Sequence, residues 1–452
     1  MGKFGTLIVL LTWTLFLGTS CTSIARLYNV REIELSDLPQ ALKNSKAGEV
    51  IYIKGGDYSD QNIVLSKRAD KNVTIRPKIA GTVKVAGAST FTITNSNNLV
   101  IEGFLFERTT GATIVMDNSQ NIRIENNYFF QCGSSHTNSI IRFKNAASDN
   151  RVINNTFDGS RALCIVVATS RDNPRDANNT GNEITYNYFV NTPSVKSAYP
   201  KSNGNGMEAI QIGLDFDETI GYKLKTKVFR NLFENIVGDG VEIISNKSSS
   251  NEIVQNTFLN NRSGITIRSG DGVKIEGNYL NLTSRGIRLF GADHVVRNNY
   301  IRGSNIGISL PSADFRKGGR MEYTGYYQQE NIDISENVII DPKNYAIQMG
   351  SGTRKLMPEN IKLTSNRIYT LGSATDYDLG GKVDRSRIQY NSNETILSRE
   401  DARSPDSRSS TVGDKKDNSV LAIKEVTGID PFTSNDPKVG AEWRRPEIKN
   451  SL

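Results

Sequence analysis

The chain of 452 residues is poor in the residue types that most often carry metal, disulfide or charge-relay chemistry. It has two histidines, His136 and His294, and three cysteines, Cys21, Cys132 and Cys164. Two histidines are too few for a histidine-based metal cluster. The sequence also gives no basis for a catalytic triad of serine, histidine and aspartate. In an oxidising compartment Cys132 and Cys164 could form a disulfide, but two buried unpaired thiols fit the sequence equally well. Chemistry is therefore expected from lysine, arginine, carboxylate and amide side chains.

Helical periodicity is almost absent, and nucleic-acid motifs are missing. The sequence shows neither a helix-turn-helix pattern nor an aromatic and basic stacking motif. The formal net charge of +7 is small against 55 basic and 48 acidic residues, although it favours a polyanionic ligand over a cationic one. We therefore expect a polyanionic glycan as the partner and no nucleic acid.

Long apolar runs are absent except at the amino terminus. Lys3 precedes an uncharged apolar run from Leu7 to Leu17, and small residues then lead to Cys21. A run of this length is typical of a signal peptide and too short for a membrane span. We expect residues 1–20 to be a signal peptide of the bacterial lipoprotein type, with Cys21 as the first mature residue. The protein would then be a periplasmic or outer-membrane lipoprotein that contacts membrane only through a lipid anchor, with ordinary secretion as the alternative.

What the sequence does have is a short unit that recurs along the chain, made of a small residue, an aliphatic, a polar residue and a second aliphatic. Because strand side chains alternate between faces, the two aliphatics of each unit point one way and the polar residue points the other. Stacked units would bury the aliphatics and leave a polar outer stripe suited to a charged, chain-like ligand. The predicted stripe comprises Gln211, Glu242, Thr266, Arg288, Ser309 and Gln348.

A second repeat pairs an alternating strand with a turn asparagine. Asn256, Asn278 and Asn299 lie 22 and 21 positions apart, a spacing typical of a solenoid. Asparagine tolerates the left-handed backbone of a tight corner, and aligned asparagines can form a ladder between coils. The sequence therefore predicts an all-β fold, a right-handed parallel β-helix, with a short capping helix within Ser36–Ser45 at its open end.

The repeat and the composition also divide the chain. We expect the β-helix domain to span residues 21–371. The segment 372–452 is polar, and residues 398–418 are rich in Ser, Asp, Arg and Lys. We expect this segment to be partly disordered or packed back on the helix, the latter around Trp443.

A candidate site lies along the predicted stripe. Arg268 follows Lys247 by 21 positions, about one coil, and Arg288 lies about one coil further on. Neighbouring strands are about 4.8 Å apart, so the three cations could meet one bound sugar. A base, a cation that neutralises a carboxylate and a group that stabilises a departing oxygen are what β-elimination from a uronate needs. Surface cations that merely hold an anionic glycan are an equally good interpretation of the residue types alone.

Several stretches together resemble the family 6 polysaccharide lyases, which comprise alginate lyases and the dermatan-cleaving chondroitinase B. These stretches are Gly48–Tyr58, Asn205–Gly213, Glu242–Ser248, Arg268–Asp271, Gly286–Gly291 and His294–Tyr300. The resemblance covers most of the chain to about residue 370 and implies a right-handed parallel β-helix. It further implies that Lys247 is the general base and that Arg268 is the general acid or the stabiliser of the leaving oxygen. By the same resemblance Arg288 binds the substrate carboxylate. We expect Gln211 and Glu208 to bind substrate as well, Gln211 as an amide that could neutralise the uronate if the metal is absent.

Two departures from the family concern calcium and a histidine. The family commonly holds Ca²⁺ with an asparagine and two glutamates spaced Glu-x-Glu. Asn205 and Glu242 match two of these ligands, whereas the third position is Gly240, which offers no carboxylate, so calcium binding is weakened or lost. The histidine that usually follows the catalytic arginine is Ser269 here.

The resemblance favours alginate as the substrate, because Gly286-Ile287-Arg288 is similar to the alginate-cleaving members. The alternatives are a dermatan sulfate lyase, a uronate C5-epimerase and a non-catalytic glycan-binding β-helix. Preference for mannuronate or guluronate and endo or exo action stay open. A long insert from Pro311 to Gln329 could close one end of a groove.

Overall fold

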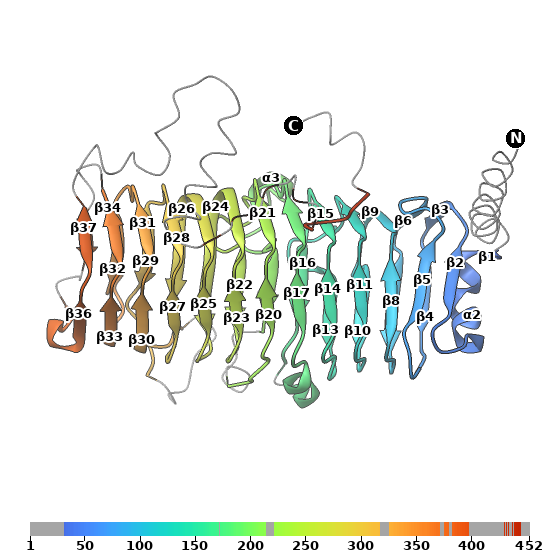
Figure 1. Ribbon diagram of the computed structural model, residues 1–452, viewed down its shortest axis with the longest axis horizontal. Helices are drawn as coiled ribbons and strands as arrows, with labels where there is room; N and C mark the ends of the chain where they lie inside the picture. The colour runs from blue at the N-terminus through green and yellow to red at the C-terminus, as the bar shows by residue number, and fades with distance from the viewer. Residues whose placement is uncertain are drawn as a thin grey trace, which may run out of the picture.

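The chain folds into a parallel β-helix, as predicted (Figure 1). The structure, a computed structural model, describes residues 31–170, 172–213, 221–316, 325–370, 375–378, 382–396, 429, 431, 433, 436 and 438–443. The expected signal peptide and Cys21 lie outside these residues. Within the described part of the chain, no helix is long and apolar enough to cross a membrane.

Every named strand pairs in parallel with the strand one coil before or after it, and the coils present three rows of strands. The first row, row A, is a separate 14-stranded sheet. Its strands are β1 (Glu32–Ile33), β2 (Val50–Ile53), β5 (Val73–Pro77), β8 (Leu99–Glu102), β11 (Arg123–Glu125), β14 (Arg151–Ile153), β17 (Glu183–Thr185), β20 (Lys227–Phe229), β23 (Glu252–Val254), β25 (Lys274–Glu276), β27 (Val295–Arg297), β30 (Glu330–Ser335), β33 (Glu359–Thr364) and β36 (Ile388–Asn391).

Rows B and C form one 23-stranded sheet, because the long strands β24 and β26 run through both rows. Row B contains β3 (Gly56–Ser59), β6 (Val83–Gly87), β9 (Leu105–Thr109), β12 (Tyr128–Phe130), β15 (Thr156–Asp158), β18 (Tyr188–Val190), β21 (Leu232–Glu234), the first parts of β24 (Thr257–Ser269) and β26 (Tyr279–Leu289), β28 (Tyr300–Arg302), β31 (Val338–Ile340), β34 (Arg367–Tyr369) and β37 (Glu394–Ile396). Row C contains β4 (Asn62–Leu65), β7 (Thr90–Thr94), β10 (Ile114–Asp117), β13 (Ser139–Lys144), β16 (Leu163–Val167), β19 (Ile210–Ile212), β22 (Ile244–Lys247), the last parts of β24 and β26, β29 (Ile306–Leu310), β32 (Tyr345–Met349) and β35 (Thr375–Asp378).

A ladder of buried asparagines marks the corner between rows A and B. Each ladder asparagine donates from Nδ2 to the Oδ1 of the next, as Asn256 does to Asn278 at 3.0 Å and Asn278 to Asn299 at 2.9 Å. The predicted ladder is therefore confirmed. The left-handed backbone, however, belongs to the preceding residue of each coil, for example Gln255 with φ of 53° and Asn298 with φ of 51°. The ladder side chains are fully buried and satisfied, which fixes each coil on its neighbour.

The interior is mainly aliphatic along row C, and the middle coils of row B add a run of aromatic side chains. Six phenylalanines of successive coils stack with ring centroids 4.6–4.9 Å apart, which matches the strand spacing. They are Phe106, Phe129, Phe157, Phe189, Phe233 and Phe258. Cys132 and Cys164 are free buried thiols in this interior, and burial raises their pKa values to about 11 and about 12.

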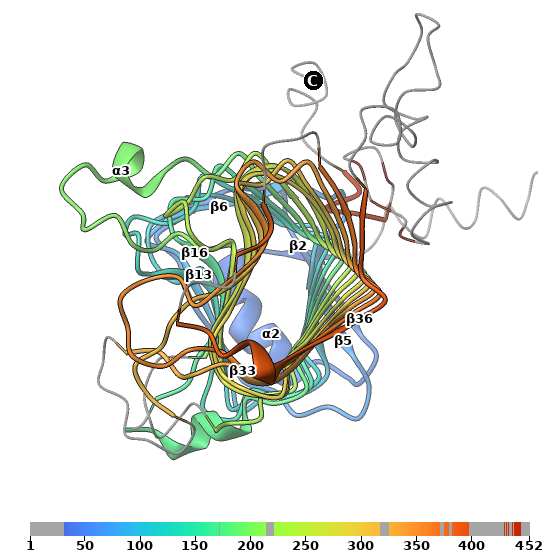
Figure 2. The same ribbon diagram turned by 90° about the vertical axis from the view of Figure 1, so that its left-hand side faces the viewer.

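The few helices lie at the end of the stack or in loops. The 3-10 helix η1 (Leu35–Asp37) and the helix α2 (Leu38–Asn44) form the predicted cap at the open amino-terminal end, where Leu35, Leu38 and Leu42 are fully buried (Figure 2). The remaining described helices are η2 (Pro174–Asn178), α3 (Val195–Ala198) and η3 (Arg385–Arg387).

The predicted end of the β-helix domain at residue 371 is wrong. One further coil, β35, β36 and β37, pairs with β32, β33 and β34. The repeat pattern does not predict this coil, because the coil carries no copy of the small-aliphatic-polar-aliphatic unit.

Part of the carboxyl-terminal segment packs back on row B. Gly440 donates its backbone N–H to the carbonyl of Tyr186 at 2.9 Å. The indole Nε1 of Trp443 donates to the carbonyl of Asn126, also at 2.9 Å. These residues, more than 250 positions apart in the sequence, therefore lie side by side.

Candidate active site

The outer face of row C carries the candidate site. The register places Gln211 of β19 beside Ser245 of β22, then Thr266 of β24 and Arg288 of β26. Ser309 of β29 and Gln348 of β32 continue the stripe. The predicted outer stripe is thus confirmed except at one coil.

Glu242 is not part of that stripe, and the prediction for its coil is wrong. The segment before β22 is a turn, in which Asp239 Oδ1 accepts hydrogen bonds from the backbone N–H groups of Val241 at 2.7 Å and Glu242 at 3.0 Å. Gly240 has a φ of 77° in this turn. The sequence Gly-Val-Glu-Ile therefore imitates the repeat unit, but the strand begins two residues after Glu242.

Lys247 ends β22 and is held by the amide of Gln211. Its Nζ donates to Gln211 Oε1 at 3.4 Å, while Gln211 Nε2 donates to the carbonyl of Gly213 at 3.1 Å. The lysine is 8% exposed, so most of its stem is packed. The chain bulges where β22 meets β24, because Lys247 pairs with Ser269 rather than with Arg268. Arg268 is therefore the extra residue of a bulge in β24, and the bulge changes its direction next to the end of β22.

Glu242 forms ion pairs with both candidate arginines. Arg288 Nη2 donates to Glu242 Oε1 at 2.9 Å, and Arg268 Nη1 lies 3.8 Å from the same oxygen. Glu242 is 3% exposed, and the Arg268 and Arg288 side chains are 24% and 12% exposed. The three residues come from three successive coils, and the structure places them next to Lys247 and Gln211. Of the predicted site residues, Asn205 alone is exposed on a loop, where its carbonyl contacts His136 Nδ1 at 2.6 Å.

Two further carboxyl groups lie beside this cluster. Burial raises the pKa of Glu208 to about 7, with the negative charges of Glu242 and Asp239 adding to the rise and Lys247 opposing it. Burial and the Glu242 charge raise the pKa of Asp239 to about 6. Among the described residues, Glu208 Oε2, Glu242 Oε2 and Arg288 Nε are buried without a hydrogen-bond partner. Buried polar atoms of this kind are expected where a polar ligand binds.

The residues that match the family's calcium ligands do not fit a divalent cation. Hard cations need several oxygen ligands, whereas Glu242 already binds two guanidinium groups. The third ligand position is Gly240, and a Cβ built there would lie 3.1 Å from Arg262 Nε. No group of three or more His, Cys, Asp or Glu residues in the described part of the chain could hold a metal ion.

Sequence reasoning missed an aromatic group beside the arginines. Phe290, just after β26, stacks on Tyr326 with ring centroids 4.1 Å apart. The guanidinium carbon of Arg268 lies 5.7 Å from the Tyr326 ring centroid, and that of Arg354 lies 4.6 Å from it. Tyr326 and Arg354 belong to loops without repeat periodicity, so no sequence pattern could place them here.

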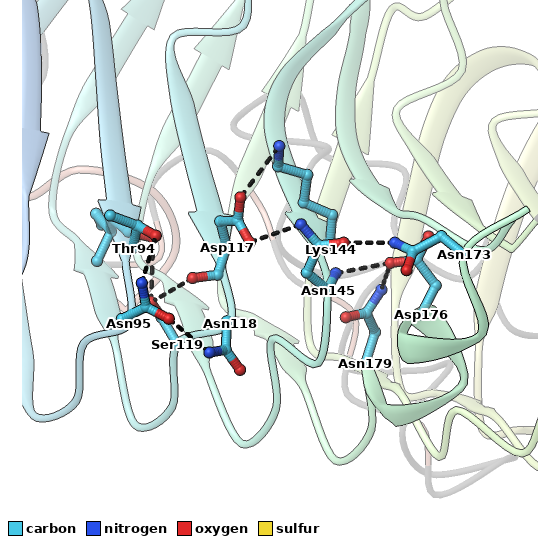
Figure 3. A network of polar contacts seen from close by, with 11 residues as sticks. Thr94, Asn95, Asp117, Asn118, Ser119, Lys144, Asn145, Asn173, Asp176 and Asn179 are labelled. Carbon is cyan, nitrogen blue, oxygen red and sulfur yellow. Dashed lines mark hydrogen bonds and ion pairs between the residues drawn. The ribbon is translucent and has the colours of Figure 1, made fainter.

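Toward the amino terminus, the strand ends of row C are occupied by an internal polar network (Figure 3). Lys144 Nζ lies 3.2 Å from Asp117 Oδ2, and Asn145 Nδ2 donates to Asp117 Oδ1 at 2.7 Å. The backbone N–H of Asn145 donates to Asp176 Oδ1 at 2.7 Å. The charge of Lys144 is therefore compensated within the protein. Arg142, the outward residue of β13 in the stripe register, is exposed and has no ion pair among the described residues.

Row C thus displays a lysine and two arginines on one outer face. Loops project on both sides of β13 and β16 of the same row (Figure 2). Such a face can bind an acidic chain and support proton abstraction next to a carboxylate. Fold and site together define the class of a parallel β-helix protein that acts on polyanionic glycans.

Comparison with known proteins gives the family. The family model described as chondroitinase B matches residues 33–429, and the chain belongs to this family, the family 6 polysaccharide lyases. The β-helix is similar to a family 6 polysaccharide lyase from Pseudopedobacter saltans, with a TM-score of 0.73 and 24% identity over 92% of this chain and 100% of that one. No curated protein matches the chain.

Two further structures are similar in fold. A mannuronic acid specific family 6 lyase from human gut microbiota has a TM-score of 0.67 at 20% identity, covering 91% of this chain and 96% of that one. The family 6 alginate lyase AlyGC has a TM-score of 0.65 at 24% identity, and the match covers 80% of this chain and 51% of AlyGC. At these identities the similarity concerns the fold.

Proposed function

We propose that the protein cleaves alginate by β-elimination and leaves unsaturated uronate ends. The observation that carries the proposal is the placement of Lys247 at the end of β22, one coil from Arg268, on the outer face of row C. Two of the similar solved structures are described as an alginate lyase and a mannuronic acid specific lyase, which supports alginate over other uronate polymers.

In this reaction Lys247 takes the proton from C5 of the uronate at its Nζ. The electron pair of the C5–H bond forms the C4–C5 double bond, and the bond from C4 to the glycosidic oxygen breaks. Arginine does not lose its proton in proteins, so we assign Arg268 to hydrogen bonding of the departing oxygen, which takes a proton from solvent.

The uronate carboxylate must be neutralised for the C5 proton to become acidic. Arg288 retains the buried Nε that Glu242 does not use, and Gln211 offers an amide next to Lys247. We assign the carboxylate to Arg288, with Gln211 and Glu208 lining the same position. No step requires calcium, and Asn205 then has no role as a ligand.

Dermatan sulfate is the second candidate substrate, because the matching family model is described as chondroitinase B. Time-resolved ultraviolet absorbance of unsaturated uronate ends distinguishes the two polymers. We expect a rise with alginate and none with dermatan sulfate. A rise with dermatan sulfate alone would reassign the substrate. Tight binding of alginate without a rise would favour a binding protein, and epimerised product without a rise would favour a C5-epimerase.

The location of the protein stays a proposal as well. We propose that residues 1–20 direct export and that Cys21 carries a lipid anchor. Metabolic labelling with a fatty acid, compared between the full chain and Cys21→Ala, tests the anchor, since only the full chain is expected to be labelled.

A further inference from the structure

Tyr326 contacts the candidate catalytic arginine, although it lies 58 positions after Arg268 in the sequence. Phe290 stacks on its ring at a centroid distance of 4.1 Å and an interplanar angle of 22°. The guanidinium of Arg354 lies over the same ring at 4.6 Å. A guanidinium this close cannot share a face with a stacked ring, so Phe290 and Arg354 occupy opposite faces of Tyr326. The ring therefore cannot serve as a stacking platform for a sugar.

The position of Tyr326 is fixed by the loops on either side of it. Asp314 Oδ2 accepts a hydrogen bond from the backbone N–H of Tyr326 at 3.0 Å and another from Arg354 Nε at 2.8 Å. The buried Gln329 side chain donates from Nε2 to the carbonyls of Leu289 and Pro311, each at 2.8 Å. These bonds tie both ends of the insert to the end of β26, which carries Arg288.

The contact of Arg268 with Glu242 is longer than that of Arg288, so contacts with the surrounding loops add to what holds its guanidinium. Its Nη1 lies 3.8 Å from Glu242 Oε1, whereas Arg288 is within hydrogen-bond distance at 2.9 Å. An arginine side chain has several rotatable bonds and loses considerable entropy when it is held in one conformation. Held between Phe290 and Arg354, the ring of Tyr326 is immobile, and its contact with the guanidinium restricts the conformations that Arg268 can adopt.

We propose that Tyr326 is a positioning residue of the elimination reaction, which holds the Arg268 guanidinium where the glycosidic oxygen departs. This role rests on the proposed function, in which Arg268 stabilises that oxygen. It requires the ring of Tyr326 and not the hydroxyl group. The insert from Pro311 to Gln329, considered from the sequence as a wall, thereby acquires a part in the chemical step.

The test compares Tyr326→Leu and Tyr326→Phe with the wild type on alginate, with Tyr390→Leu as the control. Tyr390 is an exposed tyrosine on β36 in row A. We expect Tyr326→Leu to lower kcat roughly 3- to 30-fold, the range of one cation–π interaction, with KM changed less than about twofold. Tyr326→Phe should keep the wild-type kcat, and so should Tyr390→Leu. A purely structural role of the ring would instead lower the stability of Tyr326→Leu and change KM together with kcat.

Wild-type kcat in Tyr326→Leu, or an equal loss in Tyr326→Phe, would overturn the positioning role while leaving the lyase assignment intact. A wild-type protein that cleaves no uronate polymer would overturn the proposed function, and this role with it. If Tyr326→Leu does not fold, Arg354→Met loosens the ring from its other face. That variant should then lower kcat severalfold at unchanged KM, and an unaltered kcat would overturn the role.

Discussion

Arg288 donates a hydrogen bond from Nη2 to Glu242 Oε1 at 2.9 Å, between the residue expected to bind substrate and the residue expected to bind calcium. The guanidinium supplies positive charge at the carboxylate that a metal ion would otherwise neutralise. Arg268 approaches the same oxygen from the neighbouring coil. Gly240 adds no second carboxylate at this position, and the single negative charge of Glu242 is balanced by the two arginines.

This charge balance predicts a lyase that does not depend on calcium. Turnover of alginate should stay within about twofold of its initial rate after treatment with a chelator, because Glu242 is paired with two arginines and Gly240 offers no carboxylate. Initial rates before and after chelation, and again after addition of excess Ca²⁺, provide the measurement. Loss of activity on chelation that Ca²⁺ restores would show that the site binds metal despite the ion pair.

Glu208 predicts a stability that falls as the pH rises. Its folded-state pKa of about 7 lies above the ordinary 4.5, so the neutral form is favoured in the folded protein. The stabilisation is complete below pH 4.5 and is lost as the pH rises through about 7. Glu208→Gln should therefore gain up to about 3 kcal/mol relative to the wild type at pH 8, and little at pH 5.

Urea unfolding of both proteins at both pH values measures this difference. Glu252→Gln, which changes an exposed carboxylate on β23, is the matched control and should differ little from the wild type at either pH. If Glu208→Gln changes the free energy of unfolding by the same amount at pH 5 and at pH 8, the Glu208 carboxyl group of the wild type ionises with its ordinary pKa.

The asparagine ladder predicts that replacing a single ladder asparagine lowers the free energy of unfolding considerably. Asn256 donates to Val228 and Asn278, and its Oδ1 accepts from the backbone and side-chain N–H groups of Asn231. Asn256→Ala leaves several of these buried groups without partners and should destabilise the fold by about 3 kcal/mol. Asn62→Ala on the exposed surface of β4 should change stability by less than about 0.5 kcal/mol. Chemical unfolding of the two variants checks the difference, and equal stabilities would argue against the ladder.

Those features of the fold that repeat could be predicted from the sequence. Asn256, Asn278 and Asn299 recur at coil spacing because every corner imposes the same local geometry. The aliphatic units recur because every coil must bury the same face of row C. The prediction that Glu242 lies on the outer stripe was wrong, because the turn closed by Asp239 has the same residue pattern as a strand.

The site could be predicted only where its residues belong to the repeat. Lys247, Arg268 and Arg288 lie on successive coils of row C, so their spacing placed them together. Tyr326 and Arg354 reach the site from loops whose course depends on tertiary contacts such as the bridge between Ala313 and Leu356. No local propensity or period encodes those contacts.

The most direct test of the lyase assignment is the Lys247→Ala variant, measured for both turnover and binding of alginate. We expect formation of unsaturated uronate ends to fall to background while alginate is still bound, because the proton acceptor is removed and Arg268 and Arg288 remain. Wild-type-like turnover in Lys247→Ala would contradict the assignment of Lys247 as the base, since the proton acceptor would then have to lie elsewhere.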